Sequence, residues 1–224
     1  FDFLLPALLD AADIHSGMTA VEIGSGKGLK SVVLCDHFAE YVGIELNAGE
    51  IDHAKNLATA LGKKNIGFRN GNAIDLARNP RALGLDSDPD VLVVYAVLEH
   101  LLPEERKLFL GYMRDLVERG SIVVFAETPN RIIPQDYHST QLHFVQSLEP
   151  SLALRYARKS KHDSWVNSFR DGGADLQSFY RCGAGLSYHD FEIDMGYEET
   201  AAMPFALTGW SEHFLALQPL QSDE

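Results

Sequence analysis

The feature that most constrains this chain is the stretch Ala-Val-Glu-Ile-Gly-Ser-Gly-Lys-Gly at residues 20–28. Ala20, Val21 and Ile23 predict a short buried strand, and three alternate glycines then predict a turn too tight for side chains. A helical pattern from Lys27 to Phe38 follows. Glycines let the backbone approach a ligand closely, and the first turn of a helix offers unpaired N–H groups. A phosphate-binding loop uses the same parts, so neighbouring residues must decide what the turn would hold.

Two acidic residues narrow the choice of ligand. Glu45 belongs to the next strand-like run, Tyr41 to Leu46, and a carboxylate at the end of a second parallel strand can accept hydrogen bonds from ribose hydroxyls. Glu22 precedes the first glycine of the turn by two positions. A carboxylate aimed into the turn would repel a pyrophosphate, whereas it suits a cationic nucleoside that carries an amino acid. The pair therefore favours a positively charged nucleoside.

The rest of the first half predicts alternating strands and helices. Apolar runs predict strands at Ile66–Arg69, Asp90–Tyr95 and Ser121–Ala126. Capping residues and apolar spacing predict one helix from Asn47 to Gly62 and another from Pro103 to Gly120. Strands that alternate with helices in this way indicate an α/β fold, a doubly wound parallel sheet with helices on both faces.

Four polar or glycine positions fall at the carboxyl ends of the predicted strands. They are Gly24, Glu45, Asn72 and Tyr95. Doubly wound sheets bind their ligands at this edge, so the four positions should lie around one site.

The pattern Glu-x-Gly-x-Gly-x-Gly, with Glu45 and the elements that follow it, resembles the class I S-adenosylmethionine (SAM)-dependent methyltransferases over residues 15–130. The resemblance implies a Rossmann-like sheet of seven strands, the last of them antiparallel. The runs Gly185–Asp194 and His213–Leu217 would close the sheet as an antiparallel pair. The expected activity is that of a SAM-dependent methyltransferase.

The resemblance also implies one methyltransferase domain over residues 1–224. Polar and aromatic residues cluster without any period after the fifth predicted strand, which is typical of a functional loop. We therefore expect residues 127–185 to form an insertion or lid on the substrate side.

The resemblance transfers a cofactor site onto matching positions of this chain. In the family, the residues after the third strand flank the adenine, which selects Asn72 and Ala73, with Asp75 as an acceptor for the adenine amino group. An ordinary Asn-Gly turn is the alternative for this segment. The residues expected to bind SAM are Glu22, Gly24, Ser25, Gly26, Gly28, Glu45, Leu46, Asn72, Ala73 and Tyr95.

Three histidines are candidates for a catalytic base. The segment Leu-Glu-His-Leu places His100 where the family often has a histidine near the transferred methyl group. His138 and His143 follow the fifth predicted strand and could reach the same space. A base is needed when the acceptor is a hydroxyl. The alternatives are a helix cap or packing group for His100 and exposed loop positions for the other two.

A metal site is a further alternative. Small-RNA 2′-O-methyltransferases and some quinone-pathway O-methyltransferases use Glu-x-x-Glu-His after the fourth strand and another histidine after a Thr-Pro-Asn stretch. This chain has Glu99-His100 and Thr128-Pro129-Asn130, but Ala96 stands where the first acid would be. Because one hard ligand is lost, we predict no metal site and keep a divalent ion as the less favoured possibility.

Composition limits the partners. The net charge of −13 and the lack of a basic stripe disfavour nucleic acid. Two cysteines, Cys35 and Cys182, give neither metal spacing nor a disulfide framework, and they favour a reducing cytoplasmic setting. The longest apolar run, Val91 to Leu98, is too short for a membrane span.

These observations predict SAM-dependent methylation, at oxygen, of a small molecule or a sugar-containing precursor. An NAD(P)-dependent oxidoreductase is one alternative, although its Gly-x-Gly-x-x-Gly spacing and a Tyr-x-x-x-Lys pair are missing. A non-catalytic module that binds SAM and regulates a partner is another. The oligomeric state cannot be predicted from this sequence.

Overall fold

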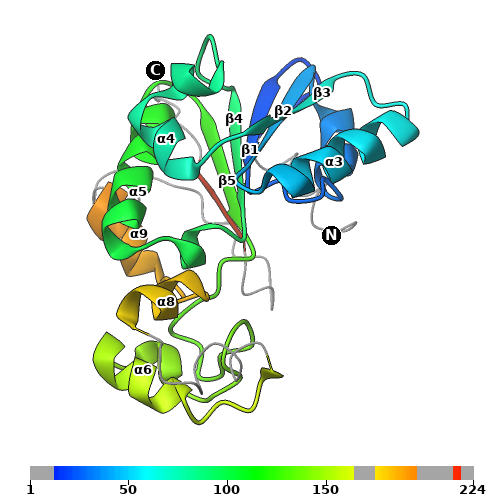
Figure 1. Cartoon of the computed structure of the whole chain (residues 1–224). Coiled ribbons are helices and arrows are strands. Elements are labelled where there is room, and N and C mark those ends of the chain that lie inside the picture. Colours follow the sequence, from blue (N-terminus) through cyan, green and yellow to red (C-terminus); the bar gives the residue numbers. More distant parts are fainter. Residues whose placement is uncertain (1–12, 164–174, 196–213, 218–224) are drawn as a thin grey trace.

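A central sheet is the middle layer of the computed structural model, which describes residues 13–163, 175–195 and 214–217 (Figure 1). In the described part of the chain its strands lie in the order β3-β2-β1-β4-β5-β6. Five strands are parallel, and β6 pairs antiparallel with β5. Their bounds are β1 Thr19–Ile23, β2 Glu40–Glu45, β3 Ile66–Asn70, β4 Val91–Tyr95, β5 Ile122–Ala126 and β6 Phe214–Leu217. The strand order reverses between β1 and β4, which is where doubly wound sheets open a ligand crevice.

Helices cover both faces of the sheet, as predicted. Figure 1 shows α4, α5 and α9 on one face and α3 on the other. The helices are α2 Ser31–Leu34, α3 Ala48–Ala60, α4 Ala73–Arg78, α5 Pro103–Glu118, α6 Pro150–Ala157, α8 Leu176–Arg181 and α9 Tyr188–Met195. Short 3₁₀ turns are η1 Cys35–His37, η2 Pro80–Leu83, η3 Leu98–His100 and η4 Val145–Ser147. Within the described residues, no helix is both long and apolar enough to cross a membrane.

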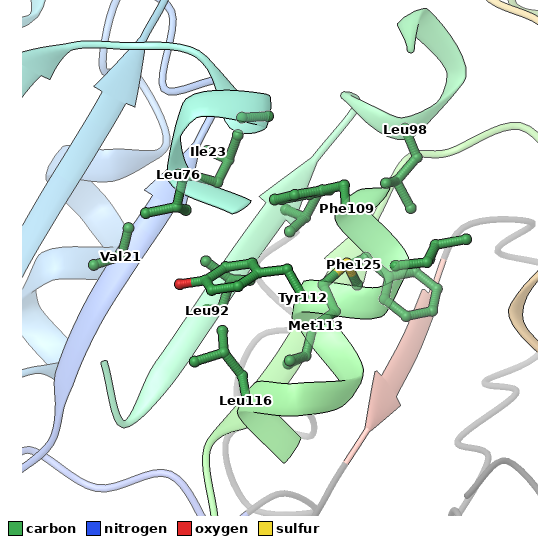
Figure 2. Packing of buried hydrophobic residues seen from close by; sticks show 14 of the residues in the cluster. Val21, Ile23, Leu76, Leu92, Leu98, Phe109, Tyr112, Met113, Leu116 and Phe125 are labelled. Carbon is green, nitrogen blue, oxygen red and sulfur yellow. The ribbon is translucent and has the colours of Figure 1, made fainter. Parts of the chain in front are cut away.

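Side chains of β4 alternate between two buried clusters. Leu92 and Val94 pack with Phe109 of α5 in the larger cluster, which Figure 2 shows from close by. Val91 and Val93 belong to a cluster on the opposite face. A parallel strand buried on both faces must be apolar at every position, which explains the uninterrupted apolar run of this segment. Each such side chain contributes about 1.5–3 kcal/mol when it is fully buried.

Most predicted elements are confirmed. The six strands of the described part begin and end within one residue of the predicted runs. Helix α3 starts after Asn47, whose side chain accepts a hydrogen bond from the Gly49 N–H at 2.9 Å, and it ends before Gly62 at φ +68°. The described residues contain six strands, so the seventh strand stays a prediction.

The predicted helix from Lys27 to Phe38 is wrong at its start. Gly28 has φ +75°, which no right-handed helix contains, and Lys30 is the residue that precedes α2. The turn therefore extends through Lys30, and a single helical turn follows it.

The predicted strand Gly185–Asp194 is also wrong, because most of it lies in α9. The Ser187 N–H and hydroxyl both donate to the Asp190 carboxylate, at 2.6 and 3.0 Å, and this pairing caps the start of the helix. Phe191 stacks on Phe125 of β5 with ring centroids 4.4 Å apart. The segment thus covers the sheet instead of extending it.

Residues after β5 build a separate small layer beyond the end of the sheet (Figure 1). Helices α6 and α8 share a compact apolar cluster that includes Val145, Ala157 and Phe179. The Ala184 N–H donates to the Glu99 carbonyl at 3.0 Å, which ties this layer to the end of β4. This layer lies within the predicted insertion at residues 127–185, of which 164–174 fall outside the described residues.

Candidate active site

The glycine turn after β1 is shaped mainly by its own protein contacts. A Cβ atom at Gly24 would lie 2.5 Å from Val97 Cγ2, and one at Gly28 would lie 2.9 Å from Ala54 Cβ. Gly26, at φ +51°, has nothing within 4 Å of its Cβ position. Packing thus explains Gly24 and Gly28, whereas at Gly26 the backbone faces open space that a ligand can reach.

Glu45 lies beside this open point, as the sequence predicts. Its Oε2 accepts the Gly26 N–H at 2.9 Å, and its Oε1 accepts the Asn47 N–H at 2.8 Å. The residue is partly exposed, and each oxygen keeps a second lone pair. The carboxylate can therefore fix the turn and still accept a hydrogen bond from a bound hydroxyl.

Glu22 lies beneath the turn. It is buried and accepts hydrogen bonds from the Ser31 hydroxyl and, at 3.0 Å, from the Tyr41 hydroxyl. Burial raises the pKa of its carboxyl group, against the opposing effect of these hydrogen bonds. Its observed role is to join β1, α2 and β2, and its contact with a cofactor stays a prediction.

The residues predicted around the adenine lie at the ends of β2 and β3. Leu46 is 69% exposed, an uncovered apolar surface next to Glu45. Asn72 caps α4 by accepting the Ile74 N–H at 2.9 Å, and Ala73 is buried behind it. Ser25 is buried, and its hydroxyl has no hydrogen-bond partner among the described residues.

The ends of β4 and β5 carry a strained pair of residues. Tyr95 lies opposite Ala126, and the next residues, Ala96 and Glu127, have φ +52° and +61°. Non-glycine residues rarely adopt this left-handed conformation, and it often marks functional sites. The Tyr95 hydroxyl hydrogen-bonds to the Glu127 carboxylate, and Lys30 Nζ lies 3.0 Å from the Tyr95 ring centroid. Sequence reasoning selected Tyr95 and missed Lys30 and Glu127.

Glu99 forms the centre of a second cluster, with two of the predicted histidines. It is fully buried, and its Oε1 lies 3.8 Å from both His100 Nε2 and His138 Nε2. That oxygen has no hydrogen-bond partner among the described residues, whereas Oε2 accepts the Thr128 hydroxyl at 3.3 Å. Burial raises the pKa of Glu99 from its usual 4.5 to about 7.

The tautomer of His100 follows from its hydrogen bond. Its Nδ1 lies 2.8 Å from the Arg181 carbonyl oxygen. A carbonyl only accepts, so Nδ1 carries the proton of the neutral ring and Nε2 presents a lone pair. That lone pair faces Glu99 Oε1. The ring of His138 lies nearby, and its centroid is 5.4 Å from the centroid of the His100 ring. Two acceptors that face each other favour a proton or a cation between them.

Two buried charged residues hold this cluster in place. Arg106 donates to the carbonyls of Leu98, Glu99 and Ala184 at 2.9, 3.1 and 2.6 Å, which fixes the turn that carries Glu99. Burial lowers its pKa to about 10.

Asp136 organises the loop that carries His138. It accepts the His138 N–H at 3.1 Å and the N–H and hydroxyl groups of Ser139 and Thr140. Burial would raise its pKa, but the hydrogen bonds outweigh burial and lower it.

His143 is not part of the cluster. It is exposed, and its backbone pairs with that of Gln135 in an isolated antiparallel β-bridge. Among the described residues, the ligand atoms that lie within 4.8 Å of one another belong to Glu99, His100 and His138. One carboxylate oxygen and two imidazole nitrogens suit a divalent cation. Ala96 supplies no ligand, so these three side chains are the ones that can hold a metal here.

A pocket of about 180 Å³ opens next to this cluster. His138 belongs to both, and Glu127 lines the pocket on the side of β5. Most of the lining residues are polar, with Tyr137 as an exposed aromatic ring, and they include no lysine or arginine. The pocket therefore suits an uncharged or cationic molecule that forms several hydrogen bonds.

Comparison with known proteins agrees with this arrangement. Residues 21–123 match a family model described as a methyltransferase domain, and no curated protein matches the chain. A SAM-dependent methyltransferase from Clostridium acetobutylicum ATCC 824 superposes with a TM-score of 0.50 and 12% identity, over 62% of this chain and 53% of that one. A DhpI–SAM–HEP complex has a TM-score of 0.44 and 22% identity, over 58% of this chain and 56% of that one. The YcgJ protein from Bacillus subtilis has a TM-score of 0.49 and 12% identity, over 80% of this chain and 82% of that one. The chain thus spans about half the length of the first two.

The strand order, the glycine turn and the carboxylate at the end of β2 define a Rossmann-like α/β domain. Residues 21–123, a little under half of the chain, are thus similar to methyltransferase domains. This similarity favours a methyltransferase over the oxidoreductase considered from the sequence.

Proposed function

We propose that the protein transfers a methyl group from SAM to a hydroxyl of a small, uncharged acceptor such as a sugar-containing precursor. The observation that carries the proposal is the cluster of Glu99, His100 and His138. It lies at the end of β4 and borders the polar pocket through His138. A base next to an acceptor pocket is what O-methylation needs and what methylation of a carboxylate does not.

The cofactor would lie along the carboxyl ends of the strands. Leu46, Asn72 and Ala73 are proposed around the adenine, and Glu45 is proposed to accept hydrogen bonds from the ribose. Gly26 supports this placement because its backbone faces open space beside the Glu45 carboxylate. The remaining predicted residues, Glu22, Gly24, Ser25, Gly28 and Tyr95, would shape the turn and the end of β4.

His100 and His138 would take the proton from the acceptor. SAM supplies an electrophilic methyl group on its sulfonium. His100 carries its own proton on Nδ1 and His138 lines the pocket, so a ring nitrogen of this pair would receive the hydroxyl proton while the methyl group passes to the acceptor oxygen. S-adenosylhomocysteine is the other product. His143 is proposed at most as a rim residue, because it lies outside the cluster.

A divalent cation held by Glu99, His100 and His138 is a second way to activate the hydroxyl. The buried and unpartnered Glu99 Oε1 favours it, because such an oxygen is costly to leave without a cation or a proton. Dialysis against a chelator, followed by metal analysis and a turnover assay, tests the idea. Lost turnover that Mg²⁺ or Mn²⁺ restores would support the metal, whereas unchanged turnover without copurified metal would leave the histidines as bases.

Calorimetry and a turnover screen test the proposed function itself. We expect SAM and S-adenosylhomocysteine to bind and NAD not to bind. A screen of neutral glycosides, phenols and anionic analogues should then yield S-adenosylhomocysteine with neutral hydroxyl acceptors. Binding of SAM without turnover on any acceptor would favour the non-catalytic module, and binding of NAD alone would refute the proposal.

A further inference from the structure

Lys30 occupies an unusual position between the glycine turn and the ends of β4 and β5. Its Nζ lies 3.0 Å from the Tyr95 ring centroid, and the residue is partly buried. Burial lowers its pKa, while the nearby carboxylates of Glu127 and Glu22 favour its charged form. Surface lysines usually extend into water, so a lysine folded onto this edge of the sheet needs an explanation.

The sheet order tells which part of a bound nucleoside would reach Lys30. Glu45 ends β2, Gly24 follows β1, Tyr95 ends β4 and Glu127 follows β5, and these strands are successive neighbours. A Cβ atom at Gly24 would lie 3.6 Å from the Tyr95 carbonyl oxygen, so the turn and the end of β4 are in contact. With the ribose at Glu45 and the adenine toward β3, the amino-acid tail must extend toward β4 and β5.

That tail is a zwitterion, with one carboxylate and one ammonium group. Lys30 offers a cation, and Glu127 offers a carboxylate that is held by the Tyr95 hydroxyl. Glu127 has the left-handed φ of +61° and follows β5 at the edge where the tail would lie. One charge of each sign is what binds an α-amino acid.

We propose that Lys30 and Glu127 bind the amino-acid tail of SAM, Lys30 its α-carboxylate and Glu127 its α-ammonium group. This assignment rests on the proposed function, because it presumes that the nucleoside lies along the same strand ends. Glu127 also lines the acceptor pocket, so the tail and the acceptor would meet at this residue.

Ligands that lack one group of the tail separate this role from a structural one. Calorimetry compares S-adenosylhomocysteine with 5′-methylthioadenosine, which has the same nucleoside and no amino acid. Lys30→Gln should weaken the binding of S-adenosylhomocysteine by about 10- to 100-fold and leave the binding of 5′-methylthioadenosine unchanged. Lys27→Gln is the matched control, because Lys27 is an exposed lysine of the same turn, and it should change neither affinity.

A second variant tests the other charge. Glu127→Gln should weaken the binding of S-adenosylhomocysteine by about tenfold or more. It should leave the binding of the desamino analogue unchanged, because that analogue has no ammonium group. An unchanged S-adenosylhomocysteine affinity in Lys30→Gln, or an equal loss for 5′-methylthioadenosine, would overturn the assignment while the proposed function stands. If the wild-type protein binds neither nucleoside, both proposals fall.

Discussion

Replacement of Glu99 by glutamine should change how the stability of the protein depends on pH. The buried carboxyl group has its pKa raised from 4.5 to about 7, chiefly by burial. The folded protein therefore keeps a proton in this window that the unfolded chain has released. The free energy of unfolding must then fall as pH rises from 4.5 to 7, by about 1.4 kcal/mol per pH unit and by about 3 kcal/mol in total.

Urea unfolding of both proteins in the presence of a chelator measures this loss. Glutamine has nearly the same shape and does not titrate, so Glu99→Gln should lack the loss. His100, His138 and Arg106 face this position in both proteins. The difference in unfolding free energy between wild type and variant should shift by about 3 kcal/mol across the window. If the free energies of unfolding of wild type and variant changed with pH in parallel, Glu99 would already be ionised in the folded protein, and this result would refute the reasoning.

Three further substitutions test other parts of the site. Glu45→Gln keeps an acceptor for the Gly26 amide but loses the anion, so S-adenosylhomocysteine should bind about 1–3 kcal/mol more weakly by calorimetry, and equal affinity would contradict the ribose assignment. His100→Asn should reduce turnover by about 10²–10⁴ with little change in SAM affinity, and full activity would make His138 the base. Arg106→Met should lower the free energy of unfolding by about 3 kcal/mol in urea, because it removes three buried hydrogen bonds from a charged donor, and a neutral effect would mean that the turn at Glu99 is held otherwise.

Local patterns explain which elements the sequence predicts well. The run around Leu92 is apolar at every position because both of its faces are buried. The segment from Gly185 to Asp194 was wrongly predicted as a strand because its alternating apolar residues also fit one. Tertiary packing decided for α9, which buries Phe191 against Phe125 and leaves Ile193 77% exposed.

The glycine turn is a case in which the sequence gives the right structure for a partly wrong reason. Its three glycines suggest close approach to a ligand throughout, whereas Gly24 and Gly28 are needed because Val97 and Ala54 pack against them. Only Gly26 faces open space among the three. Packing partners distant in sequence cannot be inferred from the turn itself.

The sequence by itself determined the doubly wound sheet, the glycine turn and the carboxylate that follows β2, because side-chain period and backbone freedom are local properties. Only the tertiary structure decided that His138, and not His143, meets Glu99 and His100, and that Lys30 lies against Tyr95. The position of His138 depends on the path of an aperiodic loop, which buried hydrogen bonds fix only after the chain has folded, and the Lys30 contact depends on how β1 and β4 pair in the sheet. A local pattern reports which face of an element is buried, and it carries no information about which distant side chain will cover that face.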